Sequence, residues 1–92
     1  MLVDIVEVRP LQGHRLWLRF EDASEGEVDV SQLVPFEGVF APLRDHAVFE
    51  EVRVDHELGT VVWPGGADID PNILYSKVTG SPLPGQQLHH AD

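Results

Sequence analysis

The sequence predicts an α+β domain, with an antiparallel sheet of about five strands (a three-strand meander plus a hairpin) and two or three short helices. Short segments of alternating apolar and polar residues predict the strands, and the connections between the first three are too short for a crossover helix. Helical spacing replaces this alternation after Ser31. The 92 residues form one domain, in which we expect residues 1–80 to fold and residues 81–92 to form a disordered C-terminal tail.

Two strands open the chain. Residues 2–8 are rich in valine and isoleucine, although their alternation is imperfect, and Pro10 ends this strand because it has no amide N–H for the ladder. Residues 15–20 alternate cleanly and predict a second strand. Its inward-facing side chains are expected to be Leu16, Leu18 and Phe20.

A third strand completes the meander. Residues 27–30 alternate again after a polar turn at residues 22–26, and Val28 and Val30 should face inward. The outward face of the second strand carries Trp17 between two arginines, where the indole can stack with a guanidinium.

Helical spacing marks the middle of the chain. Four apolar residues recur at i, i+3, i+4 and i+7, on one face of a helix: Phe36, Val39, Phe40 and Leu43. Pro42 lies inside this pattern and removes a backbone hydrogen bond, so we expect a short or broken helix. Asp45 is placed to cap a second short turn, with apolar contacts from Ala47, Val48 and Phe49.

A β-hairpin follows these short helices. Residues 52–54 and 60–63 are its expected strands, and the loop between them uses Gly59 for a left-handed backbone position. The sequence Pro64-Gly65-Gly66 then predicts a turn.

The last predicted helix runs from Pro71 to Val78. Asp70 is its expected N-cap, and proline suits the first helical position because no N–H is needed there. The side chains expected to be buried are Ile73, Leu74 and Val78. Lys77 complements the C-terminal end of the helix dipole, and Gly80 can end the helix.

Charge and composition restrict the class of partner. The net charge is −10, from 6 basic and 16 acidic residues, and the basic residues are scattered singly. Because phosphate backbones repel such a surface, we expect no nucleic-acid binding, whereas a basic protein would be attracted. The chain has no cysteine, no basic N-terminal leader, and no apolar run near the roughly 20 residues of a membrane span. We therefore expect a cytoplasmic protein that does not contact a membrane.

Four segments resemble the bacterial domain-of-unknown-function family numbered 2442, and the likeness extends over about residues 2–80. They are Leu16-Trp17-Leu18-Arg19-Phe20, Glu27-Val28-Asp29-Val30, Gly38-Val39-Phe40-Ala41-Pro42-Leu43-Arg44-Asp45, and the stretch from Trp63 to Tyr75. The last segment is the most specific, with a tryptophan, a glycine-containing turn, Ala-Asp and a Leu-Tyr pair.

The resemblance implies an α+β fold with an antiparallel sheet and short helices, and it implies no established activity. Some members of the family are encoded beside a second small domain and are described as antitoxins. Others carry a helix-turn-helix domain after this one. We expect no such domain here, because residues 81–92 are too few and lack periodicity.

Few residues qualify as catalytic or metal-binding candidates. Asp68 and Asp70 form an Asp-x-Asp pair whose oxygens suit a divalent cation, but capping by Asp70 and a turn role for Asp68 are the favoured interpretation. No zinc-site spacing relates the five histidines His14, His46, His56, His89 and His90. No serine lies in a nucleophile elbow, and Gly65-Gly66 is not followed by the residues of a phosphate loop. We therefore expect no enzyme, no cofactor and no metal.

Two predicted roles are assigned to three aromatic residues with polar edges, Trp17, Trp63 and Tyr75. Trp63 is assigned a structural role, in which it pins the following helix onto the sheet, and Trp17 is the better candidate for an interface. The candidate interaction surface consists of Trp17, Arg15, Arg19 and Tyr75. The structural motif consists of Trp63, Pro64, Gly65, Gly66, Asp68, Asp70, Pro71 and Leu74.

The leading functional hypothesis is an acidic protein-interaction module, the antitoxin-like partner of a small basic protein. It depends on the acid excess, on the absence of a catalytic constellation, and on the gene neighbours of the family that the chain resembles. Three alternatives stay open. They are a metal-dependent enzyme or regulatory domain using the Asp68/Asp70 turn, a DNA-associated regulator, which would need a basic face, and a homodimer formed through free sheet edges.

Overall fold

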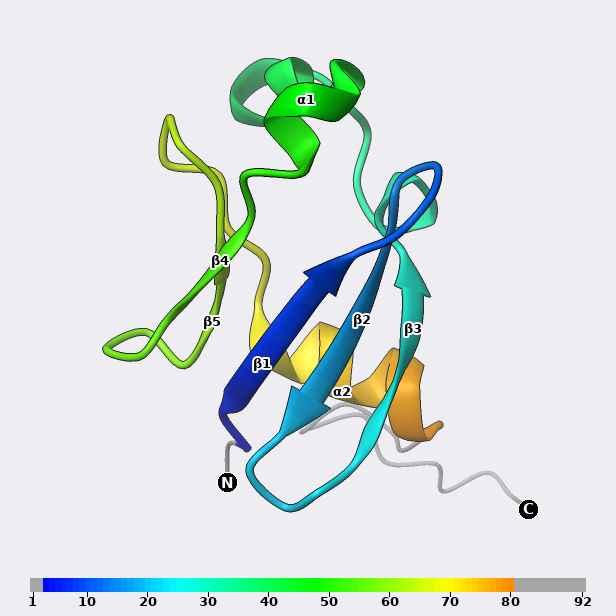
Figure 1. Cartoon of the computed structure of the whole chain (residues 1–92), viewed down its shortest axis with the longest axis vertical. Helices are drawn as coiled ribbons and strands as arrows, with labels where there is room; N and C mark the ends of the chain where they lie inside the picture. Colours follow the sequence, from blue (N-terminus) through cyan, green and yellow to red (C-terminus); the bar gives the residue numbers. More distant parts are fainter. Residues whose placement is uncertain (1–2, 81–92) are drawn as a thin grey trace, which may run out of the picture.

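The computed structural model describes residues 3–80, and in these residues five strands lie in two sheets (Figure 1). The elements are β1 Ile5–Pro10, β2 Arg15–Phe20, β3 Glu25–Asp29, the 3₁₀ helices η1 Val30–Gln32 and η2 Gly38–Arg44, α1 His46–Phe49, β4 Arg53–Asp55, β5 Thr60–Val62 and α2 Pro71–Thr79. The α+β class and the meander plus hairpin are confirmed, with β1-β2-β3 in one sheet and β4-β5 in another. The predicted tail, residues 81–92, lies outside the described residues.

A β-bulge explains the imperfect alternation of the first strand. The strand starts at Ile5, later than predicted, and its register against β2 shifts between Ile5 and Glu7. Val6 is therefore the additional residue of a bulge. As a result Ile5 and Val8 both pack in the core although they are three residues apart, while Glu7 and Arg9 face away from it.

The inner face of the three-stranded sheet forms the main part of the core. The inward residues predicted for the second strand are all fully buried: Leu16, Leu18 and Phe20. Helix α2 lies across this face (Figure 1) and buries Leu74 completely. A Cβ at Gly26 of β3 would lie 3.1 Å from Cγ1 of Val78, so the glycine permits the close approach of the helix.

The third strand starts earlier than predicted. It begins at Glu25, so the preceding turn is shorter than the expected residues 22–26. Val28 and Val30 are buried, as predicted, although Val30 already belongs to η1. Asp29 caps this 3₁₀ turn by accepting a hydrogen bond from the backbone of Ser31.

The middle of the chain forms a 3₁₀ helix, in agreement with the expectation of a short or broken helix at Pro42. The predicted apolar face is only partly correct. Leu43 is buried, but Val39 is 53% exposed, because a 3₁₀ helix does not keep the α-helical spacing on one face. Asp45 caps the next helix, as predicted, and Phe49 is its buried residue.

The hairpin is joined to the meander through its loop. Gly59 has φ +73°, as expected, and its carbonyl oxygen accepts a hydrogen bond of 3.0 Å from the N–H of Ile5. This bond and the packing of β4 and β5 beside β1 connect the two sheets. The loop residue that turns the hairpin therefore also positions it.

The last helix matches its predicted caps. The Asp70 carboxylate accepts from the backbone of Asn72, and the helix ends at Gly80, which has φ +77°. The prediction that Ile73 is buried is wrong, since it is 37% exposed. Leu74 is the fully buried residue of this helix.

Candidate functional site

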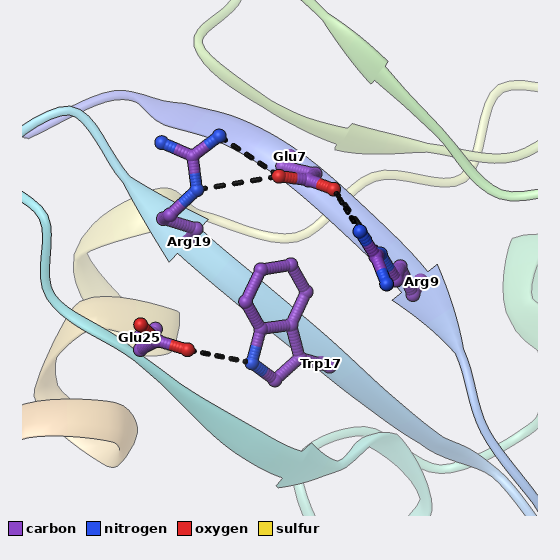
Figure 2. Close-up of polar contacts among 5 residues, drawn as sticks. All are labelled: Glu7, Arg9, Trp17, Arg19 and Glu25. Atoms are coloured by element: carbon purple, nitrogen blue, oxygen red, sulfur yellow. Dashed lines mark hydrogen bonds and ion pairs between the residues drawn. The ribbon is translucent and has the colours of Figure 1, made fainter.

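The outer face of the three-stranded sheet, on the side away from α2, carries charged residues around one tryptophan (Figure 2). Side chains at alternate strand positions share a face, so the three strands contribute one continuous set. We call it the outer face. It consists of Glu7, Arg9, Arg15, Trp17, Arg19, Glu25, Glu27 and Asp29. Three arginines and four carboxylates give it a formal charge of −1.

Glu7 holds two arginines at the centre of this face. Arg19, opposite on β2, donates to Oε1 of Glu7 from Nη2 at 2.8 Å and from Nε at 3.2 Å. Arg9 donates to Oε2 of Glu7 at 2.9 Å and 3.1 Å. These hydrogen bonds, those of Arg19 first, lower the pKa of the Glu7 carboxyl. The bulge in β1 allows these hydrogen bonds, because the shift in register places Glu7 opposite Arg19 on the outer face.

Trp17 lies between the charged residues of the neighbouring strands. The guanidinium carbon of Arg9 is 5.2 Å from the ring centroid, within the range of a cation–π contact. The indole N–H donates to Oε1 of Glu25 at 3.2 Å. The predicted stacking therefore comes from the cross-strand neighbour Arg9. Arg15 and Arg19 are each two residues along the same strand, which is farther than a directly opposed pair.

The third arginine is paired as well. Nη1 of Arg15 donates to Oε1 of Glu27 at 3.0 Å, and the two side chains are 49% and 52% exposed. Ion pairs this exposed contribute little to stability. Their effect here is on geometry, since they keep long side chains beside Trp17 in defined positions.

Tyr75 does not join the outer face. It projects from α2 on the other side of the sheet, with its ring edge-to-face against Phe20 at a centroid distance of 5.1 Å. Its hydroxyl donates to Oδ2 of Asp22 at 2.6 Å. This bond lowers the pKa of Asp22 and raises the pKa of Tyr75. The predicted interaction surface is therefore divided: three members lie together, and Tyr75 fastens α2 to the β2–β3 turn.

Trp63 is 2% exposed, and its indole contacts the helix that precedes it in the chain. The indole N–H donates to the carbonyl oxygen of Phe49 at 2.9 Å, and the two rings lie 5.8 Å apart. Trp63 thus holds α1, which precedes it in the chain, and the role predicted for it in pinning the following helix stays a prediction.

The other members of the predicted structural motif shape the backbone between β5 and α2. Gly65 and Gly66 both have φ +95°, and the N–H of Trp63 donates to the carbonyl of Ala67 to close the turn. The backbone of Asp68 forms a bridge with Val62 while its side chain is exposed. Among residues 3–80, no group of three or more histidines, cysteines or acidic residues is placed to hold a metal ion.

The family of the chain follows from the comparison with family models. The model of DUF2442, proteins of unknown function, matches residues 5–80. The chain belongs to the DUF2442 family. The match spans every strand and helix given above, and it confirms the resemblance seen in the four sequence segments. No curated protein and no solved structure matches the chain.

Two features of this DUF2442 domain were missed by the sequence analysis. The pairing of Glu7 with Arg9 and Arg19 was one, although the spacing Glu-x-Arg on a strand places both side chains on one face. The other is an aromatic cluster in which His14 lies 4.8 Å from Phe36 and 5.9 Å from His46, measured between ring centroids. These residues are distant in sequence, and no local pattern indicates that they meet.

Within residues 3–80 of this DUF2442 domain, neither the α-helices nor the 3₁₀ helices are long and apolar enough to cross a bilayer.

Proposed function

We propose that this DUF2442 domain is a non-enzymatic protein-interaction module that binds a small basic protein, as an antitoxin binds its toxin. The observation that supports this proposal is the outer face, where Trp17 is partly exposed among ion-paired side chains. Tryptophan and arginine are the residues most often found at the energetic centre of protein interfaces. Since Arg9 and Glu25 already hold the indole, little side-chain freedom would be lost when a partner covers it.

The distribution of charge supports a basic partner. The outer face has a formal charge of −1, so nearly all of the net charge of −10 lies elsewhere in the chain. Part of it lies in the β2–β3 turn, at Glu21 and Asp22, and around the β4–β5 loop, at Asp55, which ends β4, and at Glu57. An acidic surround accelerates the approach of a basic protein through electrostatic steering.

Co-expression tests this proposal. The tagged full-length chain is produced together with the protein that the adjacent gene encodes, which the proposal expects to be small and basic, and the purified material is examined by light scattering and calorimetry. We expect a stoichiometric complex, and Trp17→Ala should weaken it by about tenfold or more. Arg53→Ala, a change at an exposed arginine on β4, is the matched control and should leave the affinity unchanged. Failure of the wild-type chain to form a stoichiometric complex would count against the proposal.

A further inference from the structure

The three-stranded sheet has one blocked edge. On the outer side of β1, Pro10 has no N–H to offer, and the bulge at Val6 interrupts the strand. The N–H of Ile5 is already bonded to Gly59 in the hairpin loop. An added strand would therefore find few regular partners along β1.

Among residues 3–80, no strand pairs with the opposite edge of the sheet, which is formed by β3. Val30 N–H donates to His14 O at 2.8 Å, and Phe20 N–H donates to Ser24 O at 2.8 Å. Hydrogen-bonded positions alternate along an antiparallel pair, so the even-numbered residues 24–30 direct their backbone groups toward β2. The backbone groups of Glu25 and Glu27 consequently point away from it. Among the described strands, β3 pairs only with β2.

The side chains beside this edge favour one kind of occupant. On the outer face, Glu25, Glu27 and Asp29 follow one another at every second position. On the inner face, Gly26 and Val28 lie next to the apolar underside that α2 covers. A fourth strand would thus place one set of side chains beside three carboxylates and the other set beside apolar groups.

The negative charge beside β3 favours a different protein over a second copy of this chain as the occupant of the edge. Pairing β3 with β3 of another copy would place carboxylates next to carboxylates, which is unfavourable across neighbouring strands. Lysine or arginine at alternate positions would be favourable instead. Each glutamate accepts its hydrogen bond within the face at Oε1: the Trp17 N–H donates to Glu25 (Figure 2), and Arg15 donates to Glu27. The second oxygen can accept from an incoming cation.

We infer that the edge of β3 binds an extended segment of a basic protein as a fourth strand, with lysine or arginine at alternate positions beside Glu25, Glu27 and Asp29 and apolar residues between them. Backbone hydrogen bonds would supply the affinity, and the alternating side chains would supply the selectivity, as in other cases of strand addition. This inference rests on the proposed function. It assigns the binding of the basic protein to the edge of β3, and it gives the bound segment an extended conformation.

A pair of variants at one position tests the edge. Glu27→Pro and Glu27→Val both remove the carboxylate that pairs with Arg15, but only proline also removes the outward N–H. Both variants keep the bonds of β3 to β2, because the N–H of residue 27 is not part of that ladder. The near-ultraviolet circular dichroism of the core aromatic residues verifies that each variant is folded.

The probe is an eight-residue peptide of alternating lysine and valine, added to the isotope-labelled full-length chain and followed by NMR. A peptide with glutamate in place of lysine is its control. We expect binding of the lysine peptide, with slowed hydrogen exchange at the amides of Glu25 and Glu27. Glu27→Pro should weaken binding by about tenfold, through the lost hydrogen bond and the bulk of the ring, and Glu27→Val by no more than about threefold. Equal weakening by the two variants, or shifts confined to residues 21–22 and 55–57, would overturn the inference.

The same two variants separate this inference from the proposed function. If the wild-type chain forms a complex with the basic protein and Glu27→Pro forms it equally well, the edge is not the binding site, although the proposed function stands. If the wild-type chain forms no complex, the proposed function fails, and the NMR result with the peptide still decides whether β3 accepts a fourth strand.

Discussion

The inner and outer faces of the β1-β2-β3 sheet share one backbone and differ in what surrounds their side chains. On the inner face, Leu18 and Phe20 have no exposed surface and pack beneath α2. On the outer face, the alternate residues Trp17 and Arg19 are held by hydrogen bonds and ion pairs in contact with solvent. Burial of apolar area stabilises the fold strongly, whereas exposed pairs do so weakly.

The two tryptophans show the same difference between a buried and a partly exposed environment. Trp63 is 2% exposed and donates to a backbone carbonyl, while Trp17 is partly exposed and donates to a carboxylate. Under the proposed function, stability and recognition depend on different faces of this sheet. A change of Trp63 should therefore damage folding, and a change of Trp17 should damage binding while folding is kept.

The largest expected effect is that of Trp63→Ala. It leaves a cavity in the core and removes the indole donor from the Phe49 carbonyl, which keeps its bond from the N–H of Val52, and should lower the free energy of unfolding by about 3–5 kcal/mol. Trp63→Phe keeps most of the volume but loses the N–H donor, so about 0.5–1.5 kcal/mol is expected. Urea denaturation measures both. A loss of under about 1 kcal/mol for the alanine variant would contradict the assignment of Trp63 to the core.

A smaller loss is expected where the hairpin meets β1. Gly59→Ala places a side chain at φ +73°, and its Cβ would meet the Asp4 carboxylate, 2.7 Å from Cγ. We expect a cost of about 2 kcal/mol in urea denaturation. Gly13→Ala is the control, because φ is +68° there, close to that of Gly59, and no atom lies within 4 Å of the added Cβ. Equal losses for the two variants would mean that only backbone strain, and no contact with Asp4, matters at Gly59.

The bond between Asp22 and Tyr75 should make stability depend on pH at both ends of the range. The pKa of Asp22 is lowered in the fold from 3.8, so its contribution is present above that value and lost as pH falls through the folded pKa. The pKa of Tyr75 is raised from 10.0, so its contribution is present below pH 10.0 and lost as pH rises through the folded pKa. Tyr75→Phe keeps the ring contact with Phe20 and should flatten both slopes in a series of thermal denaturation curves.

Such a flattening would be specific to this bond. Glu7→Gln serves as the control, because it removes another carboxylate of lowered pKa without touching Tyr75. It should change the acid slope alone and leave the alkaline slope as in the wild type. If Tyr75→Phe leaves the alkaline slope unchanged, the hydroxyl of Tyr75 does not fasten α2 to the turn at Asp22.

The smallest effect on stability is expected for Trp17→Ala. The side chain is partly exposed and its contacts are a cation–π pair and one hydrogen bond to Glu25, so the loss should stay below about 1 kcal/mol. Urea denaturation measures this loss, and the co-expression experiment measures the effect on binding. A loss as large as that of Trp63→Ala would show that the outer face is part of the stable core, and the separation between the two faces would not hold.

Several parts of the fold could be predicted because they depend on neighbours in the sequence. Alternation at Leu16, Leu18 and Phe20 identified the buried face of β2, and the sequence Asp70-Pro71 identified the start of α2. Each of these signals acts within a few residues, through strand period or through capping of the first free N–H groups. The α+β class follows from the sum of such local signals.

The tertiary structure alone decided which residues meet across the sheets and helices. By itself, the sequence determined that Trp17 faces outward, but the register of β1 against β2 decided that Arg9 covers it. In the same way, the sequence indicated a structural role for Trp63, and the packing of α1 decided that Phe49 is its partner. The physical reason is that period and capping are properties of short segments, whereas register, bulges and helix docking depend on contacts between distant segments, whose relative free energies no local pattern contains.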